Sequence, residues 1–359
     1  PYRIERQMMN TTELLRKLSE ATGVSGYEDE PRAVTREAFQ PYADDLRIDA
    51  LGNLIALKRG THPAQTPVHS IMLAAHTDEI GLIVTGLDGS FIRFARVGGV
   101  DLRTIIGQEV IVHGQRPLPG IVASRPPHVL PPEERKKPVP LEKLFIDVGM
   151  PAERLEKLVR IGDLITMRRN FIELAEGFAA GKAFDDRAGV VSLAHCLETL
   201  TTMHHEWDVY AVATTQEEVG LRGATVSAYG IDPDIAIAVD VTFGAQQGVG
   251  EDQTVPIGSG PSIARGPNIH PQIHERLISV AEKHEIPHQL EVIAGATGTD
   301  AWAIQVARSG IPTGLLSIPL RYMHTSVETV CLKDIERTGR LMALFIAGLD
   351  QEFAASLGL

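Results

Sequence analysis

Five side chains of types that commonly bind metal ions occur along the chain, most of them shortly after predicted β-strands. His76, Glu218, Asp240 and His324 come soon after apolar runs typical of buried β-strands, and Asp185 lies in Gly-Lys-Ala-Phe-Asp-Asp. In an α/β protein the carboxyl ends of neighbouring parallel strands line one crevice, so residues at such positions can converge although they are far apart in sequence. Two imidazoles and three carboxylates are nitrogen and oxygen ligands that zinc and similar divalent ions accept. The pattern therefore predicts one metal site.

The number of these ligands is what a pair of ions requires. One carboxylate can bridge two ions at the roughly 3.5–4 Å separation of two-metal hydrolases, which leaves two terminal protein ligands for each ion. Asp78 follows His76 in His-Thr-Asp and can accept the second N–H of that imidazole, which would orient the ring. Glu217 stands beside Glu218 and remains as a carboxylate that can take a proton from an activated water.

The two acidic pairs constrain the backbone, because consecutive side chains on a regular strand point to opposite faces of the sheet. Glu217 and Glu218 can both reach one site only if they lie beyond the end of the preceding strand. The apolar run stops at Ala213, so the sequence permits this. A distorted backbone is likewise required at Asp185 and Asp186 if both carboxylates face the metals.

Other classes of protein use some of these residues. A glycosidase needs two carboxylates on opposite sides of a sugar bond and has no use for two histidines and a bridging aspartate. The stretch Gly177-Phe-Ala-Ala-Gly-Lys-Ala is one residue short of a phosphate-binding loop and lacks the Ser or Thr that holds magnesium, which argues against a nucleotide-binding protein. A zinc-dependent deacylase of N-acyl amino acids would use similar ligands and stays an alternative. A non-catalytic scaffold would have no need of Glu217.

Six stretches, five of which contain these residues, span nearly the whole chain. They are Ala74-Ala-His-Thr-Asp-Glu-Ile-Gly81, Gly181-Lys-Ala-Phe-Asp-Asp-Arg-Ala-Gly189, Thr214-Thr-Gln-Glu-Glu-Val-Gly-Leu-Arg-Gly-Ala224, Val239-Asp-Val241, Gly298-Thr-Asp-Ala301 and Arg321-Tyr-Met-His-Thr325. Together they resemble the tetrahedral (TET), or glutamyl-aminopeptidase-like, family of di-metal aminopeptidases, within the clan of co-catalytic zinc peptidases. No ligand position departs from the family pattern.

The resemblance implies a role for each of the five ligands. Asp185 would bridge the two ions, and His76 and Asp240 would complete the first site. Glu218 and His324 would complete the second site. The cofactors would be two divalent ions per subunit, with zinc expected and cobalt or manganese as alternatives.

The resemblance also implies the remaining catalytic roles. Glu217 would be the general base, Asp78 would orient His76, and a cis peptide bond would join Asp185 and Asp186. The predicted reaction is hydrolysis of the N-terminal peptide bond of peptides with a free N-terminus. Glu217 would accept a proton from a water activated by the two ions and pass it to the leaving amine. The preferred N-terminal residue of the substrate does not follow from the sequence.

Composition and charge narrow the class of protein without identifying it. The chain has 359 residues, of which 43% are hydrophobic and 22% charged, an ordinary composition for a globular protein. Its length is enough for about two domains. The 34 basic and 46 acidic residues give a net charge of −12, which disfavours nucleic acid or an anionic membrane as the main partner.

The cysteines and the apolar runs bear on the compartment. Cys196 and Cys331 are far apart and form no Cys-x-x-Cys, so neither a disulfide framework nor a sulfur-bound zinc is predicted. No apolar run approaches the roughly 20 residues needed to span a bilayer. The first residues, 1–7, are charged and lack the apolar core of an export signal. We expect a cytoplasmic protein.

The elements that must position these residues are those of an α/β fold, with a helix-flanked, largely parallel mixed sheet and an inserted small all-β domain. Short β-like runs separated by Gly and Pro fill residues 80–177, whereas strands and helices alternate from Gly181 onward. We predict a catalytic domain split into residues 1–79 and 178–359, with residues 80–177 as a β-rich dimerisation domain. In the resembling family such a domain makes dimer contacts, and dimers assemble into a dodecamer. The chain is therefore expected to form a homo-oligomer.

Apolar periodicity and helix-capping residues give approximate element boundaries. Thr299 and Asp300 can approach the site from the loop 295–300, or Thr299 can cap the helix that begins at Asp300, and the cap is the favoured prediction. The basic, proline-rich residues 125–138 are predicted to form an exposed loop. Helices are predicted near residues 10–21, 28–42, 187–200, 223–229, 271–284, 300–309 and 332–349, and strands near 46–58 (two), 70–75, 208–215, 235–241 and 313–318.

Overall fold

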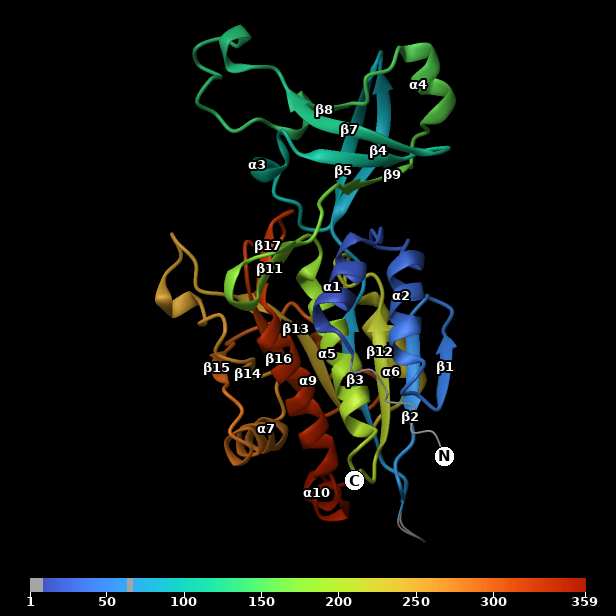
Figure 1. Ribbon diagram of the computed structural model, residues 1–359, viewed down its shortest axis with the longest axis vertical. Helices are drawn as coiled ribbons and strands as arrows, with labels where there is room; N and C mark the ends of the chain where they lie inside the picture. The colour runs from blue at the N-terminus through green and yellow to red at the C-terminus, as the bar shows by residue number, and fades with distance from the viewer. Residues whose placement is uncertain (1–8, 63–66) are drawn as a thin grey trace.

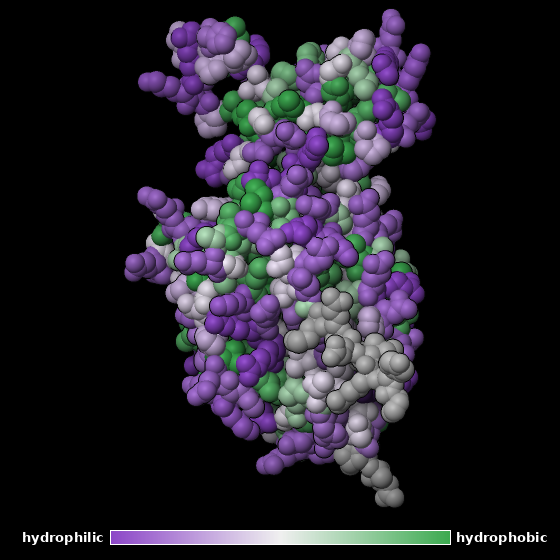
Figure 2. Space-filling model, in the orientation of Figure 1, coloured by the Kyte–Doolittle hydropathy of each residue, from purple (hydrophilic) through white to green (hydrophobic). Residues whose placement is uncertain are grey.

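The structure is a computed structural model that describes residues 9–62 and 67–359. The first residues, in which we expect no export signal, lie outside the described residues. The chain forms a large α/β body and a smaller β-barrel, which is drawn above the body in Figure 1. The predicted fold class is confirmed. Figure 2 shows the two parts as separate masses joined by a narrower neck, with hydrophilic residues over much of the visible surface.

The body is built on a mixed sheet that has 11 strands among the described residues. Its centre is parallel, in the order β12-β3-β13-β16, and antiparallel strands flank this centre. Buried apolar runs form the central strands, as expected for strands covered on both faces. The strands are β1 (Asp45–Ile48), β2 (Leu54–Lys58), β3 (Ser70–His76), β10 (Ile172–Glu173), β11 (Phe178–Gly181), β12 (Asp208–Thr214), β13 (Ile235–Phe243), β14 (Ser262–Arg265), β15 (Gln289–Val292), β16 (Thr313–Arg321) and β17 (Glu328–Cys331).

Helices cover both faces of this sheet (Figure 1). Alternate residues of β3 separate the two cores: Ile71 and Leu73 pack in the cluster that contains α1, α5 and α9, whereas Met72 and Ala74 pack with α6 and α8. The helix α5 is buried on nearly all sides, which fits its apolar sequence. The helices of the body are α1 (Thr11–Glu20), α2 (Asp29–Phe39), α5 (Phe184–Leu200), α6 (Arg222–Ile231), α7 (Pro271–Lys283), α8 (Asp300–Ile304), α9 (Leu332–Ala347) and α10 (Gln351–Leu357).

The inserted part is a closed antiparallel barrel in the order β4-β5-β8-β7-β6-β9. It has its own apolar core, and residues 125–138 are largely exposed. The barrel strands lie between Gly81 and Met167, and β10 already pairs in the main sheet; the boundaries at residues 79 and 177 stay predictions. The elements are β4 (Gly81–Asp88), β5 (Phe91–Val97), α3 (Leu102–Ile105), β6 (Glu109–His113), β7 (Pro117–Ser124), β8 (Leu144–Asp147), α4 (Ala152–Leu158) and β9 (Leu164–Met167).

Two predictions about α8 differ from the structure. The helix predicted over residues 300–309 ends at Ile304, because the chain turns back and Ile311 N–H bonds to the carbonyl of Gln305. Thr299 occupies the N-cap position of α8, but its hydroxyl donates to Thr297 Oγ1 at 3.0 Å and accepts no capping bond. The prediction that the Thr299 side chain caps this helix was therefore wrong. Within the described residues, no helix combines the length and the apolar character needed to cross a membrane.

Candidate metal centre

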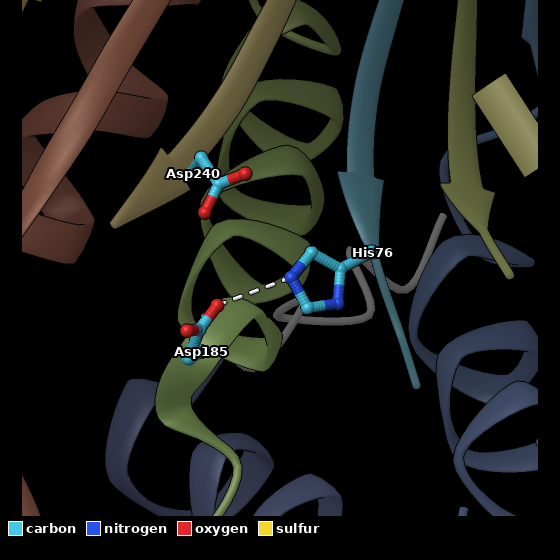
Figure 3. A group of neighbouring side chains, drawn as sticks. All are labelled: His76, Asp185 and Asp240. Carbon is cyan, nitrogen blue, oxygen red and sulfur yellow. Dashed lines mark hydrogen bonds and ion pairs between the residues drawn. The ribbon is translucent and has the colours of Figure 1, made fainter. Parts of the chain in front are cut away.

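The predicted ligands meet at the carboxyl edge of the parallel strands. His76 is the last residue of β3 and pairs with Thr214, the last residue of β12, and Asp240 lies on the neighbouring strand β13. Figure 3 shows His76, Asp185 and Asp240 turned toward one another, with Asp185 at the start of α5. The topology thus collects residues that are far apart in sequence, as the strand-end pattern predicted.

Two groups of side chains have the composition of metal ligands, and Asp185 belongs to both. His76, Asp185 and Asp240 offer atoms within 4.8 Å of one another, and so do Asp185, Glu218 and His324. Asp185 Oδ1 lies 3.1 Å from His76 Nε2, and Asp185 Oδ2 lies 3.3 Å from His324 Nε2. Each oxygen of this one carboxylate therefore faces a different imidazole.

These separations fit the coordination of zinc-like ions. Atoms at 2.0–2.2 Å from a tetrahedral ion lie about 3.3–3.6 Å from one another. The His324 Nε2–Glu218 Oε1 distance is 3.5 Å, and the two contacts of Asp185 are of similar length. His76 Nδ1 lies 3.1 Å from the carbonyl oxygen of Asp78, which can only accept, so Nδ1 carries the proton and Nε2 is left for a ligand bond.

Asp78 supports several parts of the centre at once. Its Oδ1 lies 3.5 Å from His76 Nδ1, and its Oδ2 accepts the hydroxyl proton of Ser25 at 2.6 Å. The backbone N–H groups of Glu217 and Glu218 donate to Asp78 Oδ1 and Oδ2 at 3.0 and 3.2 Å. This carboxylate is fully buried and holds the ring of His76 together with the turn that carries both glutamates.

Glu217 and Glu218 lie beyond the end of β12, as the alternation of side chains on a strand requires. The strand ends at Thr214, and Gln216 has a positive φ of 55°, which turns the chain so that both glutamates face the centre. Glu217 Oε2 lies 3.9 Å from His76 Nε2, but Glu217 belongs to neither ligand group. Its carboxylate is therefore close to the metal ligands without being one of them.

The acidic pair at the start of α5 also departs from regular geometry. The peptide bond between Asp185 and Asp186 is cis, as the resemblance implied, and neither residue has helical backbone angles. Asp186 does not join the ligand groups. Its Oδ2 accepts the backbone N–H of His76 at 3.3 Å and its Oδ1 that of Gly189 at 3.1 Å, so it fixes the backbone around the centre.

Glu328, which was not predicted from the sequence, supports the centre through backbone contacts. Its Oε1 accepts the N–H of His324 at 3.0 Å and its Oε2 that of Asp185 at 3.2 Å, and the side chain is buried. It follows His324 by four residues, a spacing that carries no motif in an irregular segment. Gly99, which follows the strand β5 of the barrel, also touches this part of the centre, because a Cβ there would lie 2.4 Å from His324 Nδ1.

The charges of the protein itself are unbalanced in this region. Burial raises the pKa of Glu217 to about 10, and the nearby charge of Asp240 adds to this shift. Burial and the charge of Asp185 raise the pKa of Glu218 to about 7. The hydrogen bond with Asp185 raises the pKa of His324 to about 9. The common cause is an excess of buried carboxylates over positive groups, which is the charge pattern that divalent cations balance.

The centre borders a cleft of about 520 Å³. Asp185, Glu217, Glu218 and Asp240 line one side, and Thr299 also lines it. Asp300 does not line the cleft. It is buried and accepts the hydroxyl proton of Thr214 at 2.6 Å, so it braces the end of β12. The cleft can admit a peptide end next to the candidate metal ligands.

The chain is similar to known aminopeptidases over most of its length. Residues 52–341 match the family described as M42 glutamyl aminopeptidase. The lysyl aminopeptidase of Pyrococcus furiosus is 38% identical over 338 residues, which cover 92% of this chain and 94% of the relative.

Solved structures agree over nearly the full length. An aminopeptidase from the archaeon Desulfurococcus kamchatkensis superimposes with a TM-score of 0.90 at 40% identity, covering 97% of each chain. The TET1 peptidase of Pyrococcus horikoshii, which can assemble into a tetrahedron or a large octahedral shell, superimposes with a TM-score of 0.82 at 32% identity, covering 95% of this chain and 100% of that one. The resemblance to the TET peptidases is thus confirmed, and the chain belongs to the M42 glutamyl aminopeptidase family of metal-dependent hydrolases and is an aminopeptidase.

Proposed function

We propose that the chain removes the N-terminal residue from peptides at a dinuclear metal centre, with Glu217 as the general base. The observation that carries this proposal is the position of Asp185, whose two oxygens face His76 and His324 in two ligand groups. A single carboxylate shared in this way is what a bridging ligand requires.

The ligands divide as the two groups do. His76 and Asp240 would hold one ion, Glu218 and His324 would hold the other, and Asp185 would contribute to both sites. The mixed nitrogen and oxygen donors favour zinc, with cobalt or manganese as substitutes. When bound, the two ions supply Lewis-acid chemistry, which polarises a peptide carbonyl and makes water nucleophilic near neutral pH.

The protein's own residues move the proton and hold the reacting groups in place. Glu217 takes the proton of the attacking water and delivers it to the leaving amine. Its position supports this role, because Oε2 is 3.9 Å from a ligand nitrogen and the carboxylate borders the cleft. Asp78 keeps His76 oriented and fixes the turn that carries Glu217.

The same chain forms a homo-oligomer in this proposal, with the barrel making dimer contacts and the dimers assembling into a dodecamer. The similarity to the TET1 peptidase of Pyrococcus horikoshii supports this assembly. Light scattering would then give a particle many times heavier than 39.0 kDa, and a species of that single mass contradicts the assembly. A cytoplasmic location is also proposed, because Cys196 and Cys331 are free and buried.

The reaction is tested by comparing two substrate classes with the enzyme loaded with zinc, cobalt or manganese. A panel of aminoacyl anilides with free amines should be cleaved, whereas N-acyl amino acids should not. Release of free amino acids from N-acyl substrates, without cleavage of any anilide, identifies a deacylase and refutes the proposal.

A further inference from the structure

The cleft beside the candidate metal centre contains one carboxylate that the proposed reaction does not use. Five acidic side chains border it: Asp185, Glu217, Glu218, Asp240 and Glu291. The first four belong to the proposed metal centre. Glu291 comes from β15, a strand that lies outside the main strand order and is attached through β14 to β16 (Figure 1).

Glu291 is held at a defined distance from the metal ligands. Thr242 Oγ1 donates to Glu291 Oε1 at 2.6 Å. Thr242 follows Asp240 by two residues on β13, so both side chains lie on the same face of the strand and about 7 Å apart along it. Glu291 therefore borders the cleft at about this distance from Asp240. The distance is comparable to the length of the four-carbon stem of a lysine side chain.

The second oxygen of Glu291 has no partner. Glu291 Oε2 is buried and accepts no hydrogen bond, and no ion pair joins Glu291 to a cation among residues 9–62 and 67–359. A carboxylate oxygen removed from water without a partner is unfavourable by itself. A cation supplied by a bound molecule would satisfy it.

The other residues that line the cleft indicate what kind of substrate side chain supplies this cation. Among the described residues that border it there is no lysine or arginine, so an acidic side chain of a substrate finds no partner beyond the metal centre. An aliphatic stem with a positive tip matches apolar walls that lead to a carboxylate. The apolar part of the lining is Leu221, Val241, Phe243, Ile293 and Met323.

We propose that Glu291 is a specificity-determining residue that selects peptides whose N-terminal side chain is a cation, namely lysine or arginine. This assignment rests on the aminopeptidase function proposed above for the same site. The peptide's first carbonyl lies at the metal centre, the first side chain extends along the apolar wall past Thr242, and its cationic tip pairs with the carboxylate of Glu291, which borders the cleft.

The test uses the metal-loaded enzyme with anilides of lysine, arginine, norleucine and glutamate. Norleucine has the unbranched four-carbon side chain without the charge. The wild-type kcat/KM for lysine is expected to exceed that for norleucine by about ten- to a hundredfold, the usual effect of a charge-assisted hydrogen bond. Glu291→Gln keeps the acceptor for Thr242 and removes the charge, so this preference should disappear, mainly through a higher KM for lysine.

Controls separate specificity from folding. Glu282→Gln, an exposed site on α7, should keep the lysine preference within about twofold of wild type. The ratio of two substrates on one variant does not depend on how much of the protein is folded. Glu291→Asp shortens the side chain by one methylene, so its carboxylate lies farther from the substrate. The preference should therefore shift from lysine toward arginine, whose side chain is longer.

Each outcome decides between the two proposals. Equal cleavage of lysine and norleucine anilides by the wild type, or an unchanged ratio in Glu291→Gln, overturns the role of Glu291 and leaves the aminopeptidase function intact. A wild-type preference for glutamate overturns it as well. Failure to cleave any anilide removes both proposals.

Discussion

Asp78 illustrates how a residue that binds no metal can determine the geometry of a metal centre. Its carboxylate contacts the ring of His76 and accepts the N–H groups of Glu217 and Glu218. A proposed ligand from each proposed ion site and the proposed base are thus positioned by one buried side chain. The hydroxyl of Ser25 satisfies a further lone pair, so the network is closed on the protein side.

Glu217→Gln is expected to keep the metals and lose turnover, because the amide cannot accept a proton but fills the same space. We expect kcat to fall by about 10²–10⁴-fold, the usual contribution of a general base. Metal content measured by atomic emission should equal that of the wild type. His76→Ala and Asp240→Ala are the contrasting variants, since each should lower metal content. Activity near the wild-type level in Glu217→Gln rules this residue out as the base.

Glu328→Ala is expected to weaken metal binding although Glu328 is no proposed ligand. The variant leaves the backbone N–H groups of Asp185 and His324 without their acceptor, and both residues belong to one ligand group. Loss of such supporting contacts typically lowers metal affinity by about 10–100-fold. Competition with a chromogenic chelator measures this change. Glu251→Ala, on the exposed surface, is the control, and equal affinities in the two variants refute the supporting role.

At the scale of elements, a buried cluster of charged side chains, Glu79, Lys182 and Arg187, joins segments that lead into the metal centre. Lys182, between β11 and α5, donates to Glu79 at 2.6 and 2.8 Å and to the carbonyl of Ala21 after α1. Arg187 of α5 donates to the carbonyls of Leu18, Ala21 and Thr77. The cluster ties the end of α1, the segment after β3 and the start of α5 together. The segment after β3 directly follows His76, and the start of α5 carries Asp185.

Lys182→Ala is expected to destabilise the fold, because Glu79 would remain buried with its closest cation removed. Breaking one side of a buried ion pair costs about 3–5 kcal/mol. Denaturant unfolding at fixed protein concentration measures the free energy. Lys283→Ala on the exposed end of α7 should change it by less than about 0.5 kcal/mol. A loss as small as this in Lys182→Ala shows that the cluster does not stabilise the body.

At the scale of the whole molecule, the alternation of apolar strands and helices predicted the α/β body. The segment interrupted by Gly and Pro predicted an inserted all-β domain, and its closure into a barrel was not predicted. Four strands after residue 177 were not predicted: β11, β14, β15 and β17. They are four residues long, and β15 alternates between half-buried and exposed residues with only weak apolar character. Such short segments depend on their neighbours for stability, which local sequence does not show.

The candidate site could be predicted from the sequence only where its residues lie at the ends of strands. Residues at strand ends could be grouped from sequence because the topology of parallel sheets brings those ends together. Glu328 could not be found in this way, because it acts on backbone N–H groups of an irregular segment. The capping role of Thr299 was wrong because its hydroxyl bonds to Thr297 instead, a contact within the loop that no helix-capping pattern contains.

Metal removal should affect the whole molecule as well as the reaction. The proposed ligands come from β3, α5, β13 and the segments after β12 and β16, so bound ions cross-link most of the body. At an ion concentration 100 times Kd, binding adds about 2.7 kcal/mol per site to stability. Dialysis against a chelator should abolish anilide cleavage and lower the thermal midpoint, and zinc or cobalt should restore both. Unchanged activity after verified metal depletion contradicts the proposed centre.

The absence of a side chain at Gly99 restricts how the barrel can evolve. A Cβ at this position would lie 2.4 Å from His324 Nδ1, so the loop after β5 presses bare backbone against the imidazole. The outer strands of the barrel can accept new sequences and new neighbours without reaching the reaction centre. At Gly99 even alanine would push the imidazole aside, so the sequence of the loop after β5 is constrained by the metal centre below it.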